Sequence, residues 1–220
     1  FFGSESDGYR SRSYSADSAL YWADDGHRGL SIRQTQGSAD GDPQDFAFPA
    51  SPTHGLVIDG DENNATRQRL VALRGQARTG NWLHEVMLSQ NASRSRFRTN
   101  GEEISGLRGE LNKAQWTASR EFTGNLFSHS LAMGMQYEQR KFRNFSASFA
   151  GANHRARDQQ RSQFVEYLLR AEQRSISVSA RHDNNQHFAN LTTWRVTGTQ
   201  AITANTRAHA SWGEGSANPT

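Results

Sequence analysis

Apolar and polar residues alternate one by one along most of this chain, in short stretches separated by turn-forming residues. Leu30 and Ile32, for example, flank Ser31. Successive side chains of a β-strand point to opposite faces, so a period of two predicts strands with one apolar and one polar face. About ten strands are expected, five of them at 9–23, 28–36, 66–78, 82–97 and 104–119, and five marked by the alternating residues 131–137, 165–169, 176–180, 194–202 and 207–212.

The connections between these stretches alternate between tight turns and long polar loops. Turns are expected at 24–27, 79–81, 120–127, 172–174 and 204–206, and the longest loops at 37–65 and 141–160. This rhythm is typical of transmembrane β-barrels of the bacterial outer membrane, which have short periplasmic turns and longer extracellular loops. The sequence therefore predicts an all-β fold, a transmembrane antiparallel β-barrel surrounded by outer-membrane lipid.

The composition agrees with such a barrel and opposes two other classes. Mean hydropathy is -0.84 and 34% of the residues are hydrophobic, without the run of roughly 18 apolar residues that a transmembrane helix needs. A barrel strand needs an apolar residue only at every second position. Disorder is disfavoured because the net charge is only +3 and aromatic residues reach 10%.

The remaining composition narrows the site chemistry. The chain has no cysteine, which excludes disulfides and thiolate metal sites. Its arginines are scattered along the strands, so a nucleic-acid patch is not favoured. The residues before Tyr9 lack the charged and apolar regions of a signal peptide. We expect the chain to be an internal piece of a longer protein.

Two structural alternatives stay open. Short strands with frequent turns also describe a soluble β-sandwich or β-helix, although strands near ten residues are long for a sandwich. The stretch 162–172 is rich in Leu, Glu, Gln and Arg, which are good helix formers. Its place between a long loop and a turn favours a strand.

The end of the chain carries the most specific motif. An aromatic residue in the last expected strand is followed by Gly-x-Gly and then by Asn-Pro-Thr: Trp212, Gly213, Gly215, Asn218, Pro219 and Thr220. This stretch resembles the barrel strand of TonB-dependent outer-membrane receptors in which an aromatic and Gly-x-Gly precede a Pro-Thr pair that opens an extracellular loop. Residues 9–25 resemble the early barrel strands of that family.

The resemblance implies a barrel of about 22 strands that encloses an N-terminal plug. Such receptors import scarce nutrients, such as ferric siderophores, haem or cobalamin, and are driven by an inner-membrane energy-coupling protein that engages the plug. Residues 1–220 would then be part of a single barrel domain, without the plug and the remaining strands. A passive porin or autotransporter-type barrel, or a soluble all-β binding module, remains the alternative.

Candidate binding residues lie on the expected polar face. Arg33, Arg74, Arg108 and Arg181 are candidates for lumen residues that attract an anionic chelate. Alternatively, they form structural ion pairs in the lumen, with Glu110, Glu138 and Glu166 as the acidic partners.

Other candidate chemistry is sparse. Asp40, Asp42 and Asp45 provide oxygen ligands that suit calcium, although their spacing departs from that of an EF-hand. Some vitamin B12 receptors of the resembled family bind calcium in such a loop. His209 and Ser211 are the one neighbouring pair that could serve a barrel enzyme, and no catalytic constellation is predicted. No cofactor is expected.

Overall fold

A computed structural model of the chain describes residues 8–22 and 26–215. These residues form one antiparallel sheet whose strands follow the order of the sequence. The strands are β1 (Gly8–Trp22), β2 (Gly26–Gly41), β3 (Glu62–Thr79), β4 (Trp82–Thr99), β5 (Glu102–Thr123), β6 (Ser128–Ser146), β7 (His154–Arg170), β8 (Arg174–Asn185), β9 (Leu191–Thr203) and β10 (Thr206–Glu214). A single turn of 3₁₀-helix, η1 (Ala150–Ala152), lies between β6 and β7.

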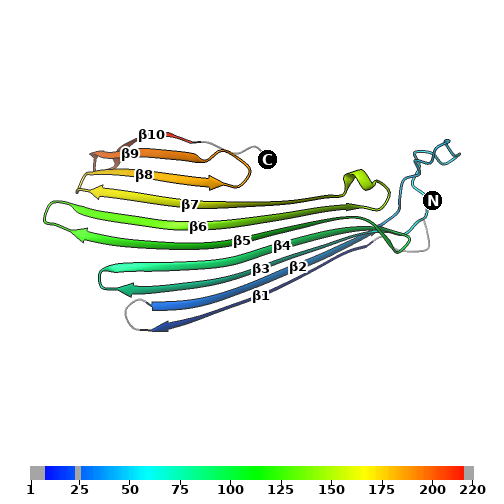
Figure 1. Cartoon of the computed structure of the whole chain (residues 1–220), viewed down its shortest axis with the longest axis horizontal. Coiled ribbons are helices and arrows are strands. Elements are labelled where there is room, and N and C mark those ends of the chain that lie inside the picture. Colours follow the sequence, from blue (N-terminus) through cyan, green and yellow to red (C-terminus); the bar gives the residue numbers. More distant parts are fainter. Residues whose placement is uncertain (1–7, 23–25, 216–220) are drawn as a thin grey trace.

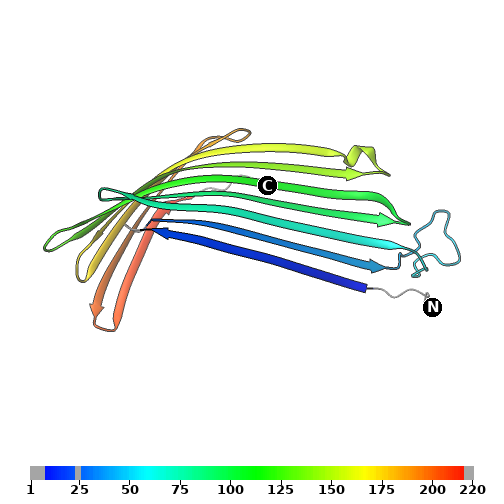
Figure 2. The same cartoon turned by 90° about the horizontal axis from the view of Figure 1, so that it is seen from below.

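The sheet is curved and open. Figure 1 shows the strands side by side from β1 to β10, and Figure 2 shows β9 and β10 bending away from the plane of the central strands. Within the described residues, β1 pairs only with β2, and β10 only with β9. The all-β antiparallel fold and the number of strands predicted from the sequence are confirmed, while closure into a larger barrel stays a proposal.

Several strands are far longer than the sequence predicted. β5 has 22 residues and β6 has 19, and at about 3.4 Å per residue β5 extends roughly 75 Å. The expected loops at 37–65 and 141–160 shorten to residues 42–61 and 147–153. Their missing parts continue as strands whose residues are mostly polar on both faces, with Phe142 and Phe145 as exceptions. Polar residues on both faces give no alternation signal, although their backbone pairing continues without interruption.

The connections do not alternate strictly between short and long. Asn100 and Gly101 join β4 to β5 in a tight turn, at the same end of the sheet as the long connections 42–61 and 147–153. Both residues have a positive φ, at 51° and 78°. The expected turn at 120–127 narrows to residues 124–127, and the first expected turn lies partly outside the described residues. We call the end of the sheet with the β3–β4, β5–β6, β7–β8 and β9–β10 connections the short-turn end, and the other the loop end (Figure 1).

Continuous register assigns each side chain to one of two faces. Residues directly opposite on neighbouring strands share a face, and Met135 of β6 lies opposite Trp116 and Gln163, while Glu138 lies opposite Lys113 and Gln160. We call these the Met135 face and the Glu138 face.

The stretch 162–172, for which a helix was considered, lies mostly within strand β7.

The sheet has almost no buried core. Ala72 and Ala118 are the buried hydrophobic residues among those described, and no second layer of described residues covers either face. The described residues therefore form a single sheet with two exposed surfaces.

In residues 8–22 and 26–215, no helix has the length and apolar character needed to cross a membrane.

Candidate functional site

An exposed apolar band runs along the Met135 face near the short-turn end. Met135 is 56% exposed, Ile176 50% and Leu73 48%. The band reaches from Leu20 on β1 to Trp212 on β10. Soluble monomers rarely expose contiguous apolar patches of more than a few hundred Å². A band that crosses ten strands therefore indicates a surface that contacts lipid or protein.

The band crosses the strands obliquely. At one level of the register, Leu73 on β3 lies opposite Leu88 on β4, but the same level reaches Arg161 on β7 and Asn184 on β8. The apolar residues of β8, such as Val178, lie nearer the short-turn end. This shift from strand to strand is expected of strands tilted against a flat apolar layer, as barrel strands are.

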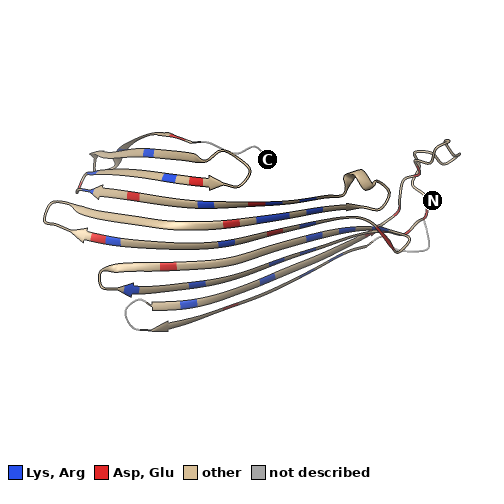
Figure 3. Cartoon of the chain, in the orientation of Figure 1, with Lys and Arg blue, Asp and Glu red and all other residues tan. Residues whose placement is uncertain are grey.

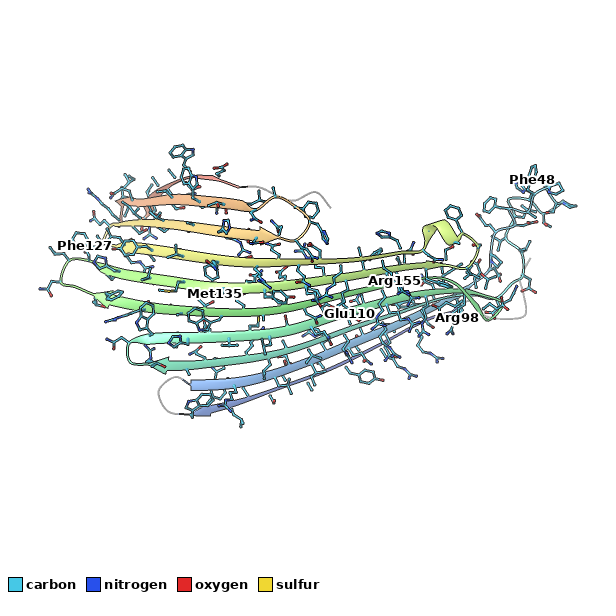
Figure 4. The ribbon with its side chains drawn as sticks, in the orientation of Figure 1. Phe48, Arg98, Glu110, Phe127, Met135 and Arg155 are labelled. Carbon is cyan, nitrogen blue, oxygen red and sulfur yellow. The ribbon has the colours of Figure 1, made fainter. Side chains whose placement is uncertain are left out.

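Beyond the band, the Met135 face becomes polar and basic. Figure 4 shows the change: Phe127 and Met135 lie toward the short-turn end, whereas Glu110, Arg155 and Arg98 follow toward the loop end. Glu110 accepts a hydrogen bond from Arg108 at 2.6 Å and lies 3.7 Å from Lys141 Nζ. One face thus has two different chemical zones along its length.

One face prediction for β5 is wrong. The alternation at 104–119 predicts that Leu107 and Leu111 share the apolar face of Met135 and that Arg108 lies on the opposite face. Register instead places both leucines on the Glu138 face and Arg108 on the Met135 face. The 22-residue strand is about twice the length needed to cross a bilayer. The alternation at 107–111 lies beyond the apolar band, which on β5 consists of Ala114, Trp116 and Ala118.

A charged cluster lies on the Glu138 face of β5 and β6. Glu138 lies 3.5 Å from Lys113 Nζ and 3.0 Å from Arg140, and it accepts a hydrogen bond from Gln136 at 2.6 Å. Lys113 and Glu138 are direct cross-strand partners. The Glu138 side chain is 14% exposed, so the two cations accompany a carboxylate that is mostly buried.

A second cluster continues this network on β7 and β8. Arg181 donates to Asp183 at 2.9 Å and to the hydroxyl of Ser162 at 2.8 Å. Ser162 is 2% exposed and accepts from Gln160, which lies directly opposite Glu138. Arg181 thus pairs with Asp183, which lies two residues later in the sequence and on the same face. The acidic partners expected from the sequence were glutamates of other strands.

Arg33 and Arg74 lie on the Glu138 face, as Arg181 does. Across residues 8–22 and 26–215, neither makes an ion pair. Arg74 lines a hollow of about 300 Å³ with His27 and Glu85. The structure therefore brings three of the four candidate arginines to one face but does not gather them into a single site.

The β2–β3 connection forms a compact loop at the loop end. Asp45 accepts hydrogen bonds from the hydroxyls of Ser51 and Thr53 and from the backbone N–H of Ala47, the last two at 2.6 and 2.9 Å. These donors, with Ser51 the strongest, lower the pKa of Asp45 from 3.8 to about 2. Phe48 projects from this loop with 97% of its surface exposed (Figure 4).

The three aspartates considered for calcium contact different partners. Asp40 accepts from Asn63 at 2.5 Å and Asp42 from the Gly60 N–H at 3.4 Å, while Asp45 is occupied within its own loop. Among the residues that the structure describes, no group of three His, Asp or Glu side chains could hold a metal ion.

The C-terminal motif is only partly described. Trp212 is 76% exposed and contacts Trp194 edge-to-face, with ring centroids 5.1 Å apart. A Cβ at Gly213 would lie 2.4 Å from the Trp194 carbonyl, so the close approach of β10 to β9 requires glycine here, whereas Gly215 has open space. Asn218, Pro219 and Thr220 lie outside the described residues. His209 and Ser211 share the Glu138 face.

Comparison with solved structures identifies the architecture. No protein-family model and no curated protein sequence matches the chain. The sheet is similar to part of the siderophore receptor PirA from Acinetobacter baumannii, with a TM-score of 0.72 and 11% identity over 93% of this chain. It is also similar to part of the outer membrane transporter YddB from Escherichia coli, with a TM-score of 0.69 and 12% identity over 90% of this chain.

The sheet has the fold of a barrel wall. The chain spans about one third of each matched structure, 33% of PirA and 30% of YddB. At this identity the likeness shows the fold alone. Both matched proteins are a receptor or a transporter, not an enzyme.

Sequence reasoning missed the basic zone of the Met135 face. Arg94 and Arg155 stand in stretches that are mostly polar on both faces, and Arg143 lies between Phe142 and Phe145, which fall on opposite faces, so the alternation assigns none of the three a side. Only the register from β3 to β7 reveals that they share one face and one level.

Proposed function

We propose that this chain forms part of the wall of an outer-membrane barrel that takes up a scarce nutrient. The carrying observation is the apolar band on one face of a sheet whose fold matches a siderophore receptor and an outer membrane transporter. The Met135 face contacts lipid, and the Glu138 face lines the lumen. Closure with further strands then pairs the backbone N–H and C=O groups at the free edges of β1 and β10. Leaving these groups unpaired in hydrocarbon would cost several kcal/mol each.

The substrate is a small nutrient chelate, of the class of ferric siderophores, haem or cobalamin, and its uptake is coupled to an inner-membrane protein through a plug. The loop end faces outward, because barrels of this kind keep their short turns on the periplasmic side. The exposed Phe46 and Phe48 of the β2–β3 loop meet the substrate first, and the lumen arginines attract it if it is anionic.

Uptake by cells that produce the complete protein tests this function. Cells that lack it should lose the uptake of one labelled nutrient from the panel of ferric siderophores, haem and cobalamin, and a protonophore should abolish that uptake. Replacing Phe46 and Phe48 with alanine should weaken substrate binding, while Phe127→Ala at the opposite end serves as the matched control (Figure 4). Uptake that survives the protonophore would instead indicate a passive pore.

The orientation is tested separately by labelling. Because this chain has no cysteine, single cysteines can be introduced into a cysteine-free complete protein. Cysteines at Ser51 and Ser148 should react with an impermeant maleimide on intact cells, and one at Asn81 in the β3–β4 turn should not. Labelling of Asn81 with protection of Ser51 would invert the topology.

A further inference from the structure

Five neighbouring strands each carry an arginine at one level of the Met135 face. Across β3 to β7, each of these residues lies directly opposite the next, and we call them the arginine row: Arg67, Arg94, Arg108, Arg143 and Arg155. Side chains directly opposite on antiparallel strands have Cβ atoms about 5 Å apart, and like charges in such pairs destabilise a sheet. Four consecutive like-charge pairs therefore call for an anion.

The protein supplies few acids to this row. Arg94 lies 3.6 Å from Glu103, and Arg108 lies 2.6 Å from Glu110, which Lys141 also approaches. Among the described residues, the other three members have no acidic partner. Basic residues recur in the right-hand half of β3 to β7, with a few acidic residues among them (Figure 3). Most of the charge is thus left for a partner outside the chain.

Two hollows lie along the row. One has a volume of about 260 Å³ and is lined by Arg67 and Arg94 with Arg12 of β1. The other has a volume of about 530 Å³ and is lined by Arg94, Arg108 and Arg143. The planar fork of arginine binds phosphate oxygens through two parallel hydrogen bonds, so converging guanidinium groups favour phosphate.

The row lies just beyond the apolar band. Its first four members lie four to six residues from a residue of the apolar band on the same strand, or roughly 13–20 Å along the strand. These band residues are Val71, Leu88, Ala114 and Tyr137. A membrane that covers the band therefore presents its headgroups to the row.

We propose that the arginine row binds the phosphate groups of a phosphorylated glycolipid in the outer leaflet of the membrane. This inference rests on the proposed function for its orientation, because the loop end must face outward. Apolar contact with the acyl chains along the band and phosphate contact at the row then act on the same lipid molecule.

Glycolipid binding by the complete protein in neutral detergent tests this proposal, with lipid A as the phosphorylated probe and native mass spectrometry as the readout. A variant with R67Q, R143Q and R155Q removes three charges without leaving an acid unpaired. We expect it to weaken lipid A binding about tenfold or more. The matched control, R33Q with R74Q and R170Q, removes three charges from the Glu138 face and should bind lipid A as the wild type does.

Dephosphorylated lipid A should bind the wild type as weakly as lipid A binds the row variant. Equal binding of the two lipids, or equal losses in the row and control variants, would overturn the proposal. Displacement of lipid A by inorganic phosphate would overturn it in favour of a soluble anion site. Nutrient uptake by the row variant should persist. A failure of glycolipid binding would therefore leave the proposed function standing. A failure of nutrient uptake by the wild type would contradict the proposed function without changing the measured lipid affinity.

Discussion

The two halves of the Met135 face carry opposite chemistry on the same strands. On β6 the residues nearer the short turn are Met133, Met135 and Tyr137, whereas the same face continues toward the loop end with Gln139, Lys141 and Arg143. Backbone pairing is continuous through both halves. The difference teaches that hydrogen bonding fixes the length of these strands, while side chains alone decide which part of each strand suits lipid.

The largest expected effect distinguishes the two halves directly. Met135→Arg should lower the free energy of unfolding by about 2–4 kcal/mol, because an arginine near the middle of the bilayer loses its hydration. Gln139→Arg on the same face of β6 should cost at most about 1 kcal/mol, since it lies at the edge of the band. Urea unfolding of the complete protein in lipid vesicles measures both. Equal costs would remove the distinction between the halves.

Packing on the Glu138 face should differ between the halves as well. A Cβ at Gly134 would lie 2.5 Å from both the Phe164 ring and the Trp116 carbonyl, so Gly134→Ala should destabilise the protein by about 1–3 kcal/mol. Gly109→Ala in the loop half meets only the Ser93 hydroxyl at 3.0 Å, which can rotate away.

Thermal unfolding of the two glycine variants measures this difference. We expect a clearly lower midpoint for Gly134→Ala and nearly no change for Gly109→Ala. A midpoint unchanged in both would show that Phe164 does not pack tightly over the short-turn half of the wall.

A smaller, local effect is expected in the β2–β3 loop. The lowered pKa of Asp45 means that its stabilising contribution is complete above pH 3.8 and is lost as the pH falls through about 2. Asp45→Asn should reduce the hydrogen-exchange protection of Ala47 at neutral pH, because a neutral amide binds these donors less strongly than a carboxylate does. Asp59→Asn in the same loop is the control, and equal losses in the two variants would contradict the assigned role.

Much of the fold could be predicted from the sequence where the two faces of a strand differ in polarity. On β8, Ile176 and Val178 alternate with serines, and the predicted faces are confirmed. The prediction was wrong for β5 because Leu107 and Leu111 alternate with polar residues outside the apolar band. A period of two gives the side of a residue relative to its neighbours, but not its depth along the strand.

The site could be predicted less well, because its contacts join residues from different strands. Arg33 and Arg74 share one face, as their places in the alternation predict, whereas their role as lumen residues stays a prediction. The pairing of Glu138 with Lys113 depends on the β5–β6 register, and that of Arg181 with Ser162 on the β7–β8 register. No feature of the sequence fixes these registers, since the polar stretches at the loop end admit several.

The most direct test of whether the Met135 face contacts lipid near the short-turn end compares two spin labels on this face of β6. Labels at cysteines replacing Met135 and Arg143, in the complete protein in lipid vesicles, are exposed to oxygen, which concentrates in the hydrocarbon, and to a water-soluble nickel chelate. We predict that oxygen relaxes the label at Met135 more strongly and that the nickel chelate relaxes the label at Arg143 more strongly. The same ratio of the two effects at both positions would contradict the account.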